Sequence, residues 1–523
     1  MKEIAVLAIA RYGDLIQTTP LLRNLKRAWP DARITLIVED RFAGILSMIR
    51  GYDLSITLNK REIAQKIATG DSPLEPYLQM ESFVRLLEEG SYDLLINITC
   101  SRLSAFLSSA ANSREHTGIT ADERGQRDIR TMWGMYVFSW FNDNVRKYNP
   151  INLVDIFTRL GKVMPDGKRV ELFPTDEGER FAEEFLAKHG LAGERLIGLQ
   201  LGASEAIRCW PAENFARISD RLQRETGART ILFGAPNEKH LAEKAKSFME
   251  LPPIDAVGET SLEGLLSLVR RCSTVVSNDT GTMHFAAASG VPAVMLCIGP
   301  AFFRCTGPYG EGHLALQPDI PCSPCPYGLD CNRPDCRLGI TPEAVFSACT
   351  HILEGGDGLS SDDFRGVKVY RSDFADDGYL SWTGLYNVDA ATEGIIKRSE
   401  GMWKRCCDGT GAKAAAPRDE VLRDFHRLMT DGIKVTSQII EAARRKPLPL
   451  DRIKKLGEEE AALETELKLM GYRHEILTQI ASFLTLVREN ITVEELGAVA
   501  AETRRIYETG KCLVENLQVG LHA

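Results

Sequence analysis

The sequence predicts an α/β protein with two doubly wound, parallel-sheet domains followed by an α-helical C-terminal region. Three observations lead to this prediction. Short, continuous apolar runs alternate with amphipathic segments over about the first 350 residues, which is typical of strands buried on both faces. After Gly355 the apolar spacing becomes almost wholly helical. The length of 523 residues exceeds what one core supports, and about 150 residues per domain suggests three domains or so.

The composition is that of an ordinary globular protein, with 44% apolar and 26% charged residues. A net charge of −9 argues against a general nucleic-acid binder. No apolar run approaches the ~18–20 residues that cross a bilayer. The apolar stretch at residues 4–10 is followed at once by Arg11, so we expect a buried first strand rather than a signal peptide. The thirteen cysteines, with no sign of export, predict reduced thiols or metal ligands in the cytosol.

The alternation predicts an N-terminal domain over 1–165 and a second over 166–355, with a cleft between them. Strands are expected at Ile4–Ile9, Ile34–Val38, Leu54–Thr57, Leu94–Ile98, Leu196–Leu201, Thr230–Phe233, Thr274–Ser277 and Ala293–Cys297. Helices are expected at Thr18–Ala28, Ser82–Glu88, Asp176–Lys188, Ala212–Glu225, Glu238–Phe248 and Leu262–Arg270. The alternation pauses in the polar stretch 113–150 and again near Met164–Lys168.

Residues 356–418 read as a linker with a short strand at Val367–Tyr370, and residues 419–523 as a helical appendage. Apolar stripes at helical spacing cover Val421–Ile440 and Leu463–Val487, and Thr492 with Glu495 predicts a capping box for a last helix. An antiparallel hairpin of the first two helices leaves one side open. We therefore expect this region to mediate self-association or to dock an acceptor protein, and to be dispensable for donor binding.

The stretch "VVSNDTGTMH" places polar residues where a buried strand gives way to a helix. In open α/β sheets ligands bind beyond the carboxyl ends of strands, where a helix N-terminus offers free N–H groups. A glycine there lets the backbone approach an anion closely. The alternative is an ordinary capped helix with a structural histidine. The diphosphate reading assigns Asp279, Thr280, Gly281 and His284 to the site.

A second junction, "GLQLGASEAIRCWPAENF", runs from a strand through Gly202 and Ser204 to Arg208, a permanent cation suited to phosphate oxygens. On its own Arg208 is equally a solvated loop residue. Gly13 and Asp14 follow the first strand, and this junction has no G-x-G-x-x-G fingerprint. Hydride chemistry on a classical dinucleotide-binding site is therefore disfavoured. Asp14 is either a helix cap or a general base.

Four cysteines lie close together in "PCSPCPYGLDCNRPDC", with the spacing C-x2-C-x5-C-x4-C. Four thiolates suit a tetrahedral structural metal, either zinc or a single iron. The alternative is a cluster of reduced thiols without metal. The candidate ligands, in the loop 322–336, are Cys322, Cys325, Cys331 and Cys336.

Over about residues 1–355 the sequence resembles the heptosyltransferases of glycosyltransferase family 9. The resemblance rests on "RYGDLIQTTPLLRNLKRAWPDARITLIVE", "LGASEAIRCWPAENFARI", "NDTGTMHFAAASGVPAV" and "TGPYG" before "CSPC". It implies the GT-B fold, in which two Rossmann-like domains face each other and the C-terminal one holds the sugar nucleotide. It also implies an inverting reaction that needs no catalytic metal.

By this resemblance Asp14 is the general base, and Arg208 stands where the family usually has lysine at the diphosphate. Gly202 and Ser204 belong to the same loop, and the nucleotide-sugar motif comprises Asp279, Thr280, Gly281 and His284. Autotransporter heptosyltransferases carry a comparable four-cysteine iron finger. The chain departs from the family at Pro236 and Asn237, where some members have a ribose-binding glutamate, and at Thr282, where proline is commoner.

The expected function is inverting transfer of a heptose, or a similar sugar, from a nucleotide diphosphate such as ADP-heptose to a lipopolysaccharide-core or protein hydroxyl. The alternatives are a non-catalytic sugar-nucleotide-binding assembly module and a GT-B NDP-sugar epimerase. We expect a cytoplasmic protein, at the inner face of the membrane with at most peripheral contact, that forms a homo-oligomer through the C-terminal helices and binds no nucleic acid. Candidates for contacting an anionic acceptor are Lys60, Arg61, Arg114, Arg124, Arg127 and Arg130.

Overall fold

The structure is a computed structural model that describes residues 1–9, 11–70, 73–139, 146–329, 331–333, 335–355, 360–410 and 419–519. The chain divides into two compact units. The first comprises Met1–Ile96, Asn112–Arg114 and Ile151–Asp389, and the second comprises Asn97–Ala111, Glu115–Pro150 and Ala390–Ala523. These limits differ from the predicted ones at 165 and 355, because the segment 115–150 groups with the C-terminal helices.

Within the described residues, the first sheet has five strands in the order β3-β2-β1-β4-β5. Its strands are β1 (Glu3–Ala8), β2 (Arg33–Glu39), β3 (Leu54–Leu58), β4 (Leu94–Asn97) and β5 (His116–Gly118). β1 pairs in parallel with β2, and β2 with β3. Because residues 4–8 are wholly buried, β1 lies in the core as its apolar run predicts.

The helices of this N-terminal part follow the strands in the expected alternation. They are α1 (Tyr12–Gln17), α2 (Thr19–Ala28), η1 (Asp40–Met48), α3 (Lys60–Thr69), α4 (Leu74–Glu89), α5 (Arg102–Ala110), α6 (Met132–Ser139) and α8 (Leu153–Leu160). A small hairpin of β6 (Thr120–Ala121) and β7 (Arg127–Asp128) precedes α6. The stretch 113–150, predicted to be irregular, therefore contains short strands and a helix.

The second sheet has eight strands in the part of the chain that the structure describes, in the order β10-β9-β8-β11-β12-β13-β14-β15. They are β8 (Leu196–Gln200), β9 (Arg229–Phe233), β10 (Ile254–Asp255), β11 (Cys272–Asn278), β12 (Ala293–Leu296), β13 (Leu314–Pro318), β14 (Val367–Phe374) and β15 (Leu380–Tyr386). β8 to β13 pair in parallel, as in a doubly wound sheet.

The helices of this part are those of alternating β–α units. They are α9 (Asp176–Lys188), η2 (Ala206–Arg208), α10 (Ala212–Thr226), η3 (Pro236–Glu238), α11 (Lys239–Lys246), α12 (Leu262–Val269), α13 (Gly281–Ser289), α14 (Phe303–Thr306), α15 (Asp335–Gly339), α16 (Pro342–Glu354) and η4 (Ser361–Phe364). The α/β fold class predicted from the alternation is thus confirmed, and all eight predicted strands are present.

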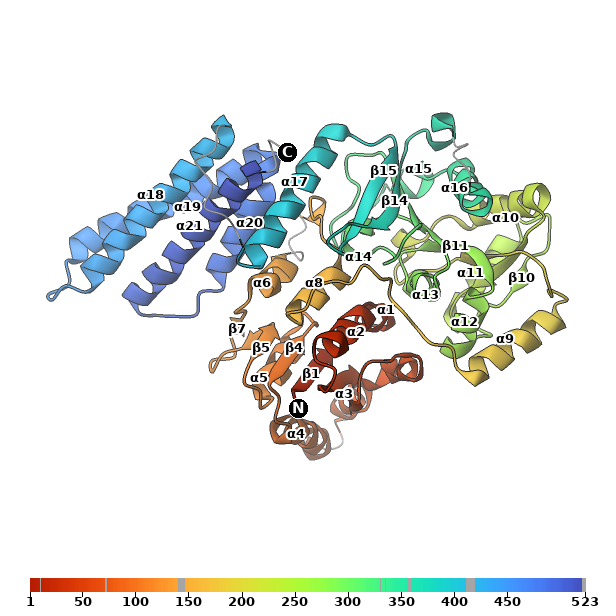
Figure 1. Cartoon of the computed structure of the whole chain (residues 1–523), viewed down its shortest axis with the longest axis horizontal. Coiled ribbons are helices and arrows are strands. Elements are labelled where there is room, and N and C mark those ends of the chain that lie inside the picture. The colour runs from red at the N-terminus through yellow and green to blue at the C-terminus, as the bar shows by residue number, and fades with distance from the viewer. Residues whose placement is uncertain are drawn as a thin grey trace. The chain divides into compact units, whose positions relative to one another are not determined.

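The strand predicted at Val367–Tyr370 within the linker 356–418 is present as part of a longer β14, whereas β15 was not predicted. Residues 367–386 form the β14–β15 hairpin, and β14 pairs antiparallel with β13 (Figure 1). Val367 and Val369 are buried, and Lys368 between them is more accessible. The alternation of buried and accessible residues that is typical of a strand is therefore present here, although the surrounding sequence is polar. Residues 356–359 and 411–418 of the predicted linker lie outside the described residues.

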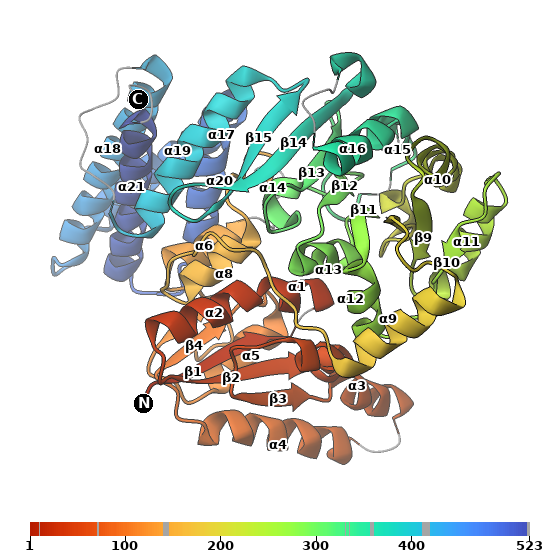
Figure 2. The same cartoon turned by 45° about the vertical axis from the view of Figure 1, so that its right-hand side comes forward.

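The second unit contains α17 (Ala390–Cys407), α18 (Glu420–Ala443), α19 (Leu450–Arg473), α20 (Glu475–Glu489) and α21 (Leu496–Val519). In both views α18 and α21 lie side by side (Figures 1 and 2). α6 contacts α17 and α20 in this unit. The indole N–H of Trp133 on α6 donates to Asp408 at 2.8 Å, and Trp403 on α17 packs against Phe483 on α20.

The predicted C-terminal helices exist, with two corrections. The stripe Leu463–Val487 is divided between α19 and α20, because His474 takes an extended conformation. The last helix begins at Leu496, so Thr492 is too early to cap it.

The open side expected for the helical hairpin is also wrong. Most of the stripe residues are buried within the unit, including Phe425, Met429, Leu477, Ile480, Leu484 and Leu513. Because these apolar side chains are already covered, they give no reason to expect self-association through these helices. A search of the described helices found none long and apolar enough to span a membrane.

Candidate functional site

Asp14 lies in the first turn of α1, directly beyond the carboxyl end of β1. Its Oδ2 accepts a hydrogen bond from the backbone N–H of Arg11 at 3.1 Å. Burial raises the pKa of the Asp14 carboxyl, the N–H and charge of Arg11 oppose the rise, and the charge of Asp279 adds to it. The residue remains half-accessible, so the carboxylate can still reach a ligand. Asp14 therefore has the predicted capping role at the start of α1, and its role as a general base stays a prediction.

His284 on α13 packs directly against Gly13. A Cβ added to Gly13 would lie 2.9 Å from Cδ2 and 3.3 Å from Nε2 of the His284 ring. No side chain fits at residue 13 unless the ring moves. This contact brings the first turn of α1, which carries Asp14, and the helix that carries His284 together, as the predicted site requires.

The imidazole of His284 is neutral at physiological pH. The residue is 6% exposed, and burial lowers its pKa to about 4 while the charge of Asp279 opposes the shift. Among the described residues its Nδ1 has no hydrogen-bond partner. A neutral, buried ring with a free nitrogen can exchange a hydrogen bond with a ligand but supplies no positive charge.

Arg208 is buried and is engaged with two other predicted site residues. Its Nη2 forms an ion pair with the carboxylate of Asp279, and its Nη1 donates to Ser204 Oγ at 3.1 Å. Its Nε has no hydrogen-bond partner in the part of the chain that is described. The solvated-loop alternative is therefore wrong for Arg208, because the guanidinium lies inside the site at 7% exposure. It retains donors for an anionic ligand.

Thr280 and Gly281 form the start of α13, a helix of nine residues. Thr280 is the N-cap residue, but its side chain makes no capping hydrogen bond. A Cβ at Gly281 would meet nothing within 4 Å. The N-terminus of α13 is thus open to close approach, and its N–H groups and dipole favour an anion.

Asn278 is a structural residue of the site that the sequence analysis did not single out. Its side chain is fully buried, its Oδ1 accepts from the N–H of Trp210 at 3.0 Å, and its Nδ2 donates to the carbonyl of Leu201 at 2.9 Å. Asn278 therefore fixes the end of β11 to the β8–α10 loop. Thr282 adds a similar tie, since its hydroxyl donates to Gln200 Oε1 at 2.7 Å.

Glu238 is a second residue that the sequence analysis missed. Its Oε2 accepts from the N–H of Ala235 at 2.8 Å and from Gln200 Nε2 at 3.2 Å. A Cβ at Gly202 would lie 1.9 Å from Glu238 Oε1, so the glycine makes room for this carboxylate. A glutamate thus lies one residue after the departure at Pro236 and Asn237.

The four clustered cysteines lie near one another, but they do not form a recognisable ligand set. Burial raises the pKa of Cys325 to about 11, and the charges of Cys336, Cys322 and Cys331 add to the rise. Across the described residues, no three His, Cys, Asp or Glu side chains are arranged to hold a metal ion. The zinc or iron predicted at this loop therefore stays a prediction.

The six basic residues proposed for an acceptor have different surroundings. Four are paired with carboxylates: Lys60 with Glu39 at 3.0 Å, Arg114 with Asp93 at 3.0 Å, Arg130 with Asp128 at 2.6 Å, and Arg124 with Glu494. Arg61 is exposed on α3. Arg124 and Arg127 line a cavity.

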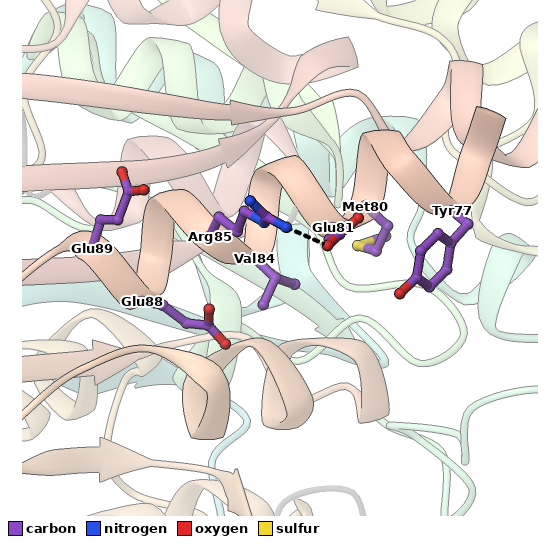
Figure 3. A pocket seen from close by; sticks show the side chains of 7 residues that line it. All are labelled: Tyr77, Met80, Glu81, Val84, Arg85, Glu88 and Glu89. Carbon is purple, nitrogen blue, oxygen red and sulfur yellow. Dashed lines mark hydrogen bonds and ion pairs between the residues drawn. The ribbon is translucent and has the colours of Figure 1, made fainter. Parts of the chain in front are cut away.

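A separate hollow of about 670 Å³ lies along α4 (Figure 3). Its seven lining residues all belong to this helix, and Arg85 pairs with Glu81 at 2.7 Å in its middle. None of the predicted site residues lies there. It is a surface feature of one helix, with no constellation of catalytic groups.

Residues 80–332 match glycosyltransferase family 9 (heptosyltransferase). The chain is 23% identical over 290 residues to lipopolysaccharide heptosyltransferase 3 of Escherichia coli, covering 54% of this chain and 80% of that protein. It is 26% identical over 329 residues to lipooligosaccharide heptosyltransferase 2 of Haemophilus ducreyi, covering 60% and 88%.

Solved structures agree in fold. The family 9 glycosyltransferase from Veillonella parvula superposes with a TM-score of 0.54 at 22% identity, covering 68% of this chain and 98% of that one. The E. coli ADP-heptose LPS heptosyltransferase II gives a TM-score of 0.50 at 20% identity, covering 68% and 99%. The fold is GT-B with an added helical C-terminal region. This chain therefore contains a glycosyltransferase family 9 (heptosyltransferase) domain and is a glycosyltransferase.

Proposed function

We propose that this chain is an inverting glycosyltransferase that transfers a heptose, or a closely similar sugar, from a nucleotide-diphosphate donor to a hydroxyl of a lipopolysaccharide-core acceptor. The observation that carries the proposal is the contact of Gly13 with the ring of His284. It places a carboxylate with a raised pKa beside the helix whose N-terminus favours a diphosphate.

In this proposal the donor diphosphate binds at the N-terminus of α13. Arg208 supplies the cation, and the pairing with Asp279 orients its guanidinium toward the same helix end. A buried arginine loses little freedom on binding, because its neighbours already hold it. The neutral His284 offers Nδ1 for a hydrogen bond to the donor.

Glu238 is proposed to accept hydrogen bonds from the ribose hydroxyls. A carboxylate accepts several hydrogen bonds and pairs readily with vicinal hydroxyls. Gly202 leaves the space that this carboxylate occupies, and Gln200 and Ala235 hold it in place. The predicted role of Gly202 in the donor loop thus acquires a physical reason.

The chemical step follows from these positions. Asp14 takes the proton of the acceptor hydroxyl as its oxygen attacks the anomeric carbon of the donor. The bond between that carbon and the diphosphate oxygen breaks, and the nucleoside diphosphate leaves with the electron pair. Arg208 and the N–H groups of α13 stabilise the charge that develops on the leaving group. No metal takes part in this step. The acceptor oxygen attacks from the face opposite the leaving diphosphate, so the anomeric configuration is inverted.

The names of the relatives support heptose as the sugar, ADP-heptose as the donor and lipopolysaccharide as the acceptor class. A cytoplasmic location at the inner face of the membrane is part of the same proposal. It is supported by the thirteen cysteines, all of which lie in the described residues as thiols, because thiols persist in reducing compartments.

A direct assay tests the proposal. The purified chain is incubated with ADP-heptose and a heptose-free lipopolysaccharide core, and ADP release and product mass are measured. We expect acceptor-dependent ADP release and a product with inverted anomeric configuration by NMR. Acceptor-independent turnover of the donor would instead indicate an epimerase or hydrolase. Donor binding without turnover would indicate an assembly module.

A further inference from the structure

A cavity of about 880 Å³ lies wholly within the second unit. Four chain segments form its walls: the start of α5, the β6–β7 hairpin, the end of α6 with Phe138, and residues 489–494 between α20 and α21. The C-terminal helical region, which the established activity leaves without a role, thus supplies one wall of a cavity.

Three arginines line this cavity. The guanidinium of Arg127 lies 3.9 Å from the centre of the Phe138 ring, and that of Arg102 lies 5.6 Å from the centre of the Phe106 ring. Both are exposed, and neither forms an ion pair with any residue that the structure describes. A guanidinium lying over a ring keeps its in-plane N–H donors available for an anion.

The third arginine connects the two sides of the cavity. Arg124 of the hairpin pairs with Glu494 of the α20–α21 loop. The loop also places Ile491 and Val493 against the cavity, beside the polar Thr492. Cations, aromatic rings and short polar side chains therefore share one enclosure. Sugars present both C–H faces and hydroxyls, and a cavity of this size lies within the range of about 300–1,000 Å³ typical of ligand sites.

The loop wall is held from behind by a buried network. Arg488, the residue next to the loop, donates from Nη2 to Glu460 Oε2 at 2.6 Å and pairs with Glu464 at 3.2 Å. Tyr507 donates to the same Glu460 at 3.0 Å. These contacts join α19, α20 and α21 at the base of the loop, so the wall is anchored rather than free to adapt.

We propose that this cavity binds an anionic saccharide portion of the acceptor, and that the α20–α21 loop helps to select that acceptor. The inference rests on the proposed function, since it takes the acceptor to be a charged glycan. Phosphate or carboxylate groups of the glycan bind Arg102 and Arg127, while its rings lie against Phe106 and Phe138.

The first test removes both unpaired charges in the full-length chain. The probe is a deacylated, phosphorylated core oligosaccharide released from lipopolysaccharide, and titration calorimetry measures its Kd. In the Arg102→Gln/Arg127→Gln variant we expect a rise of about tenfold or more, since two charge-assisted contacts are lost. The control is Arg221→Gln, because Arg221 is an exposed arginine 3.7 Å from the centre of a ring, that of Phe346, on another surface. It should bind like the wild type.

The second test addresses the loop. Val493→Asp adds a negative charge to the wall and should weaken oligosaccharide binding at low salt, with the effect fading as salt screens it. Tyr472→Asp adds the same charge at a side chain on α19 that is 81% exposed and outside the cavity, and should have no effect. Thermal melting checks that all variants fold.

The outcomes separate the inference from the proposed function. If the wild type fails to bind ADP-heptose, the proposed function is refuted. If it binds the donor, but the oligosaccharide binds all cavity variants and the wild type equally, only the inference is refuted. The inference is also overturned if the dephosphorylated oligosaccharide binds with the same affinity as the phosphorylated one. It is overturned as well if the chain transfers the sugar to a protein and does not bind the glycan.

Discussion

Gly202→Ala tests the donor site at one defined contact. The added methyl group would lie 1.9 Å from Oε1 and 2.2 Å from Cδ of Glu238, so the carboxylate must leave its present position. The carboxylate is the far end of a flexible side chain, and the backbone at Gly202 is not in the left-handed region. We therefore expect the variant to fold with nearly the melting temperature of the wild type.

The effect on donor binding should be much larger. Displacing Glu238 breaks its hydrogen bonds to Ala235 at 2.8 Å and to Gln200 at 3.2 Å, and withdraws the acceptor proposed for the ribose hydroxyls. Hydrogen bonds to charged groups contribute about 1.5–3 kcal/mol each. Losing one such contact with the donor raises the Kd by roughly 10- to 150-fold. Calorimetric titration with ADP measures this loss without turnover.

A double-mutant cycle identifies the cause. If Gly202 acts through Glu238, then Gly202→Ala should have almost no further effect in a Glu238→Ala background. Gly457→Ala serves as control, because a methyl group there meets nothing within 4 Å on a helix outside the donor site. Additive losses of affinity, or a large fall in melting temperature with unchanged affinity, would refute this account of the contact.

Four further predictions follow from the structure. Gly281→Ala should fold normally, since its Cβ has open space, yet weaken ADP binding in a fluorescence titration by obstructing the approach to α13. Asp14→Asn should lower the transfer rate by about 10²–10⁴-fold and remove the loss of activity that we expect in the wild type as pH falls through the raised pKa of Asp14. The same variant should melt at a higher temperature at neutral pH, because a raised carboxyl pKa destabilises the fold as pH rises above it. Arg23→Ala should cost about 2 kcal/mol in denaturant unfolding, because the buried Asp166 would lose its closest ion pair and keep the longer contact with Arg27 at 3.4 Å, and Asp166→Asn should restore part of it. Burial alone would raise the pKa of Asp166, but its hydrogen bond to Arg23 outweighs this effect and lowers the pKa. The stability that the ion pair contributes is therefore present at neutral pH and is lost as pH falls through the pKa of Asp166 in the folded state. Elemental analysis should find one zinc or iron per chain at the cysteine loop 322–336, and its absence would leave a thiol cluster.

Most of the α/β framework was predictable because its strands are continuous apolar runs with sharp ends. β1 and β11 were located within two residues on this signal alone. The strand predicted at Val367–Tyr370 lies in β14, but the rest of the β14–β15 hairpin was not predicted, because the aspartate and glycine residues around it hide a short alternation.

The site was predictable where its residues share one short motif. Asp279, Thr280, Gly281 and His284 are adjacent in sequence and adjacent in space. Glu238 carries no such signal, because its relation to Gly202 exists only after β8 and β9 have paired. The same is true of Asn278, whose partner Gln200 lies 78 residues earlier in the chain.

The second unit has a consequence for how the protein is made. Trp133 forms a hydrogen bond with Asp408, which lies 275 residues later in the chain. Tyr148 forms one with Glu475, which lies 327 residues later. At about 5–20 residues per second, the ribosome needs roughly 15–65 s to supply these partners. During that interval the aromatic residues of α6 lack the contacts that α17 and α20 supply, so we expect the nascent chain to bind holdase chaperones. A chain that stops near Gly355 would keep this exposure permanently, and it would also lack the two strands that complete the second sheet.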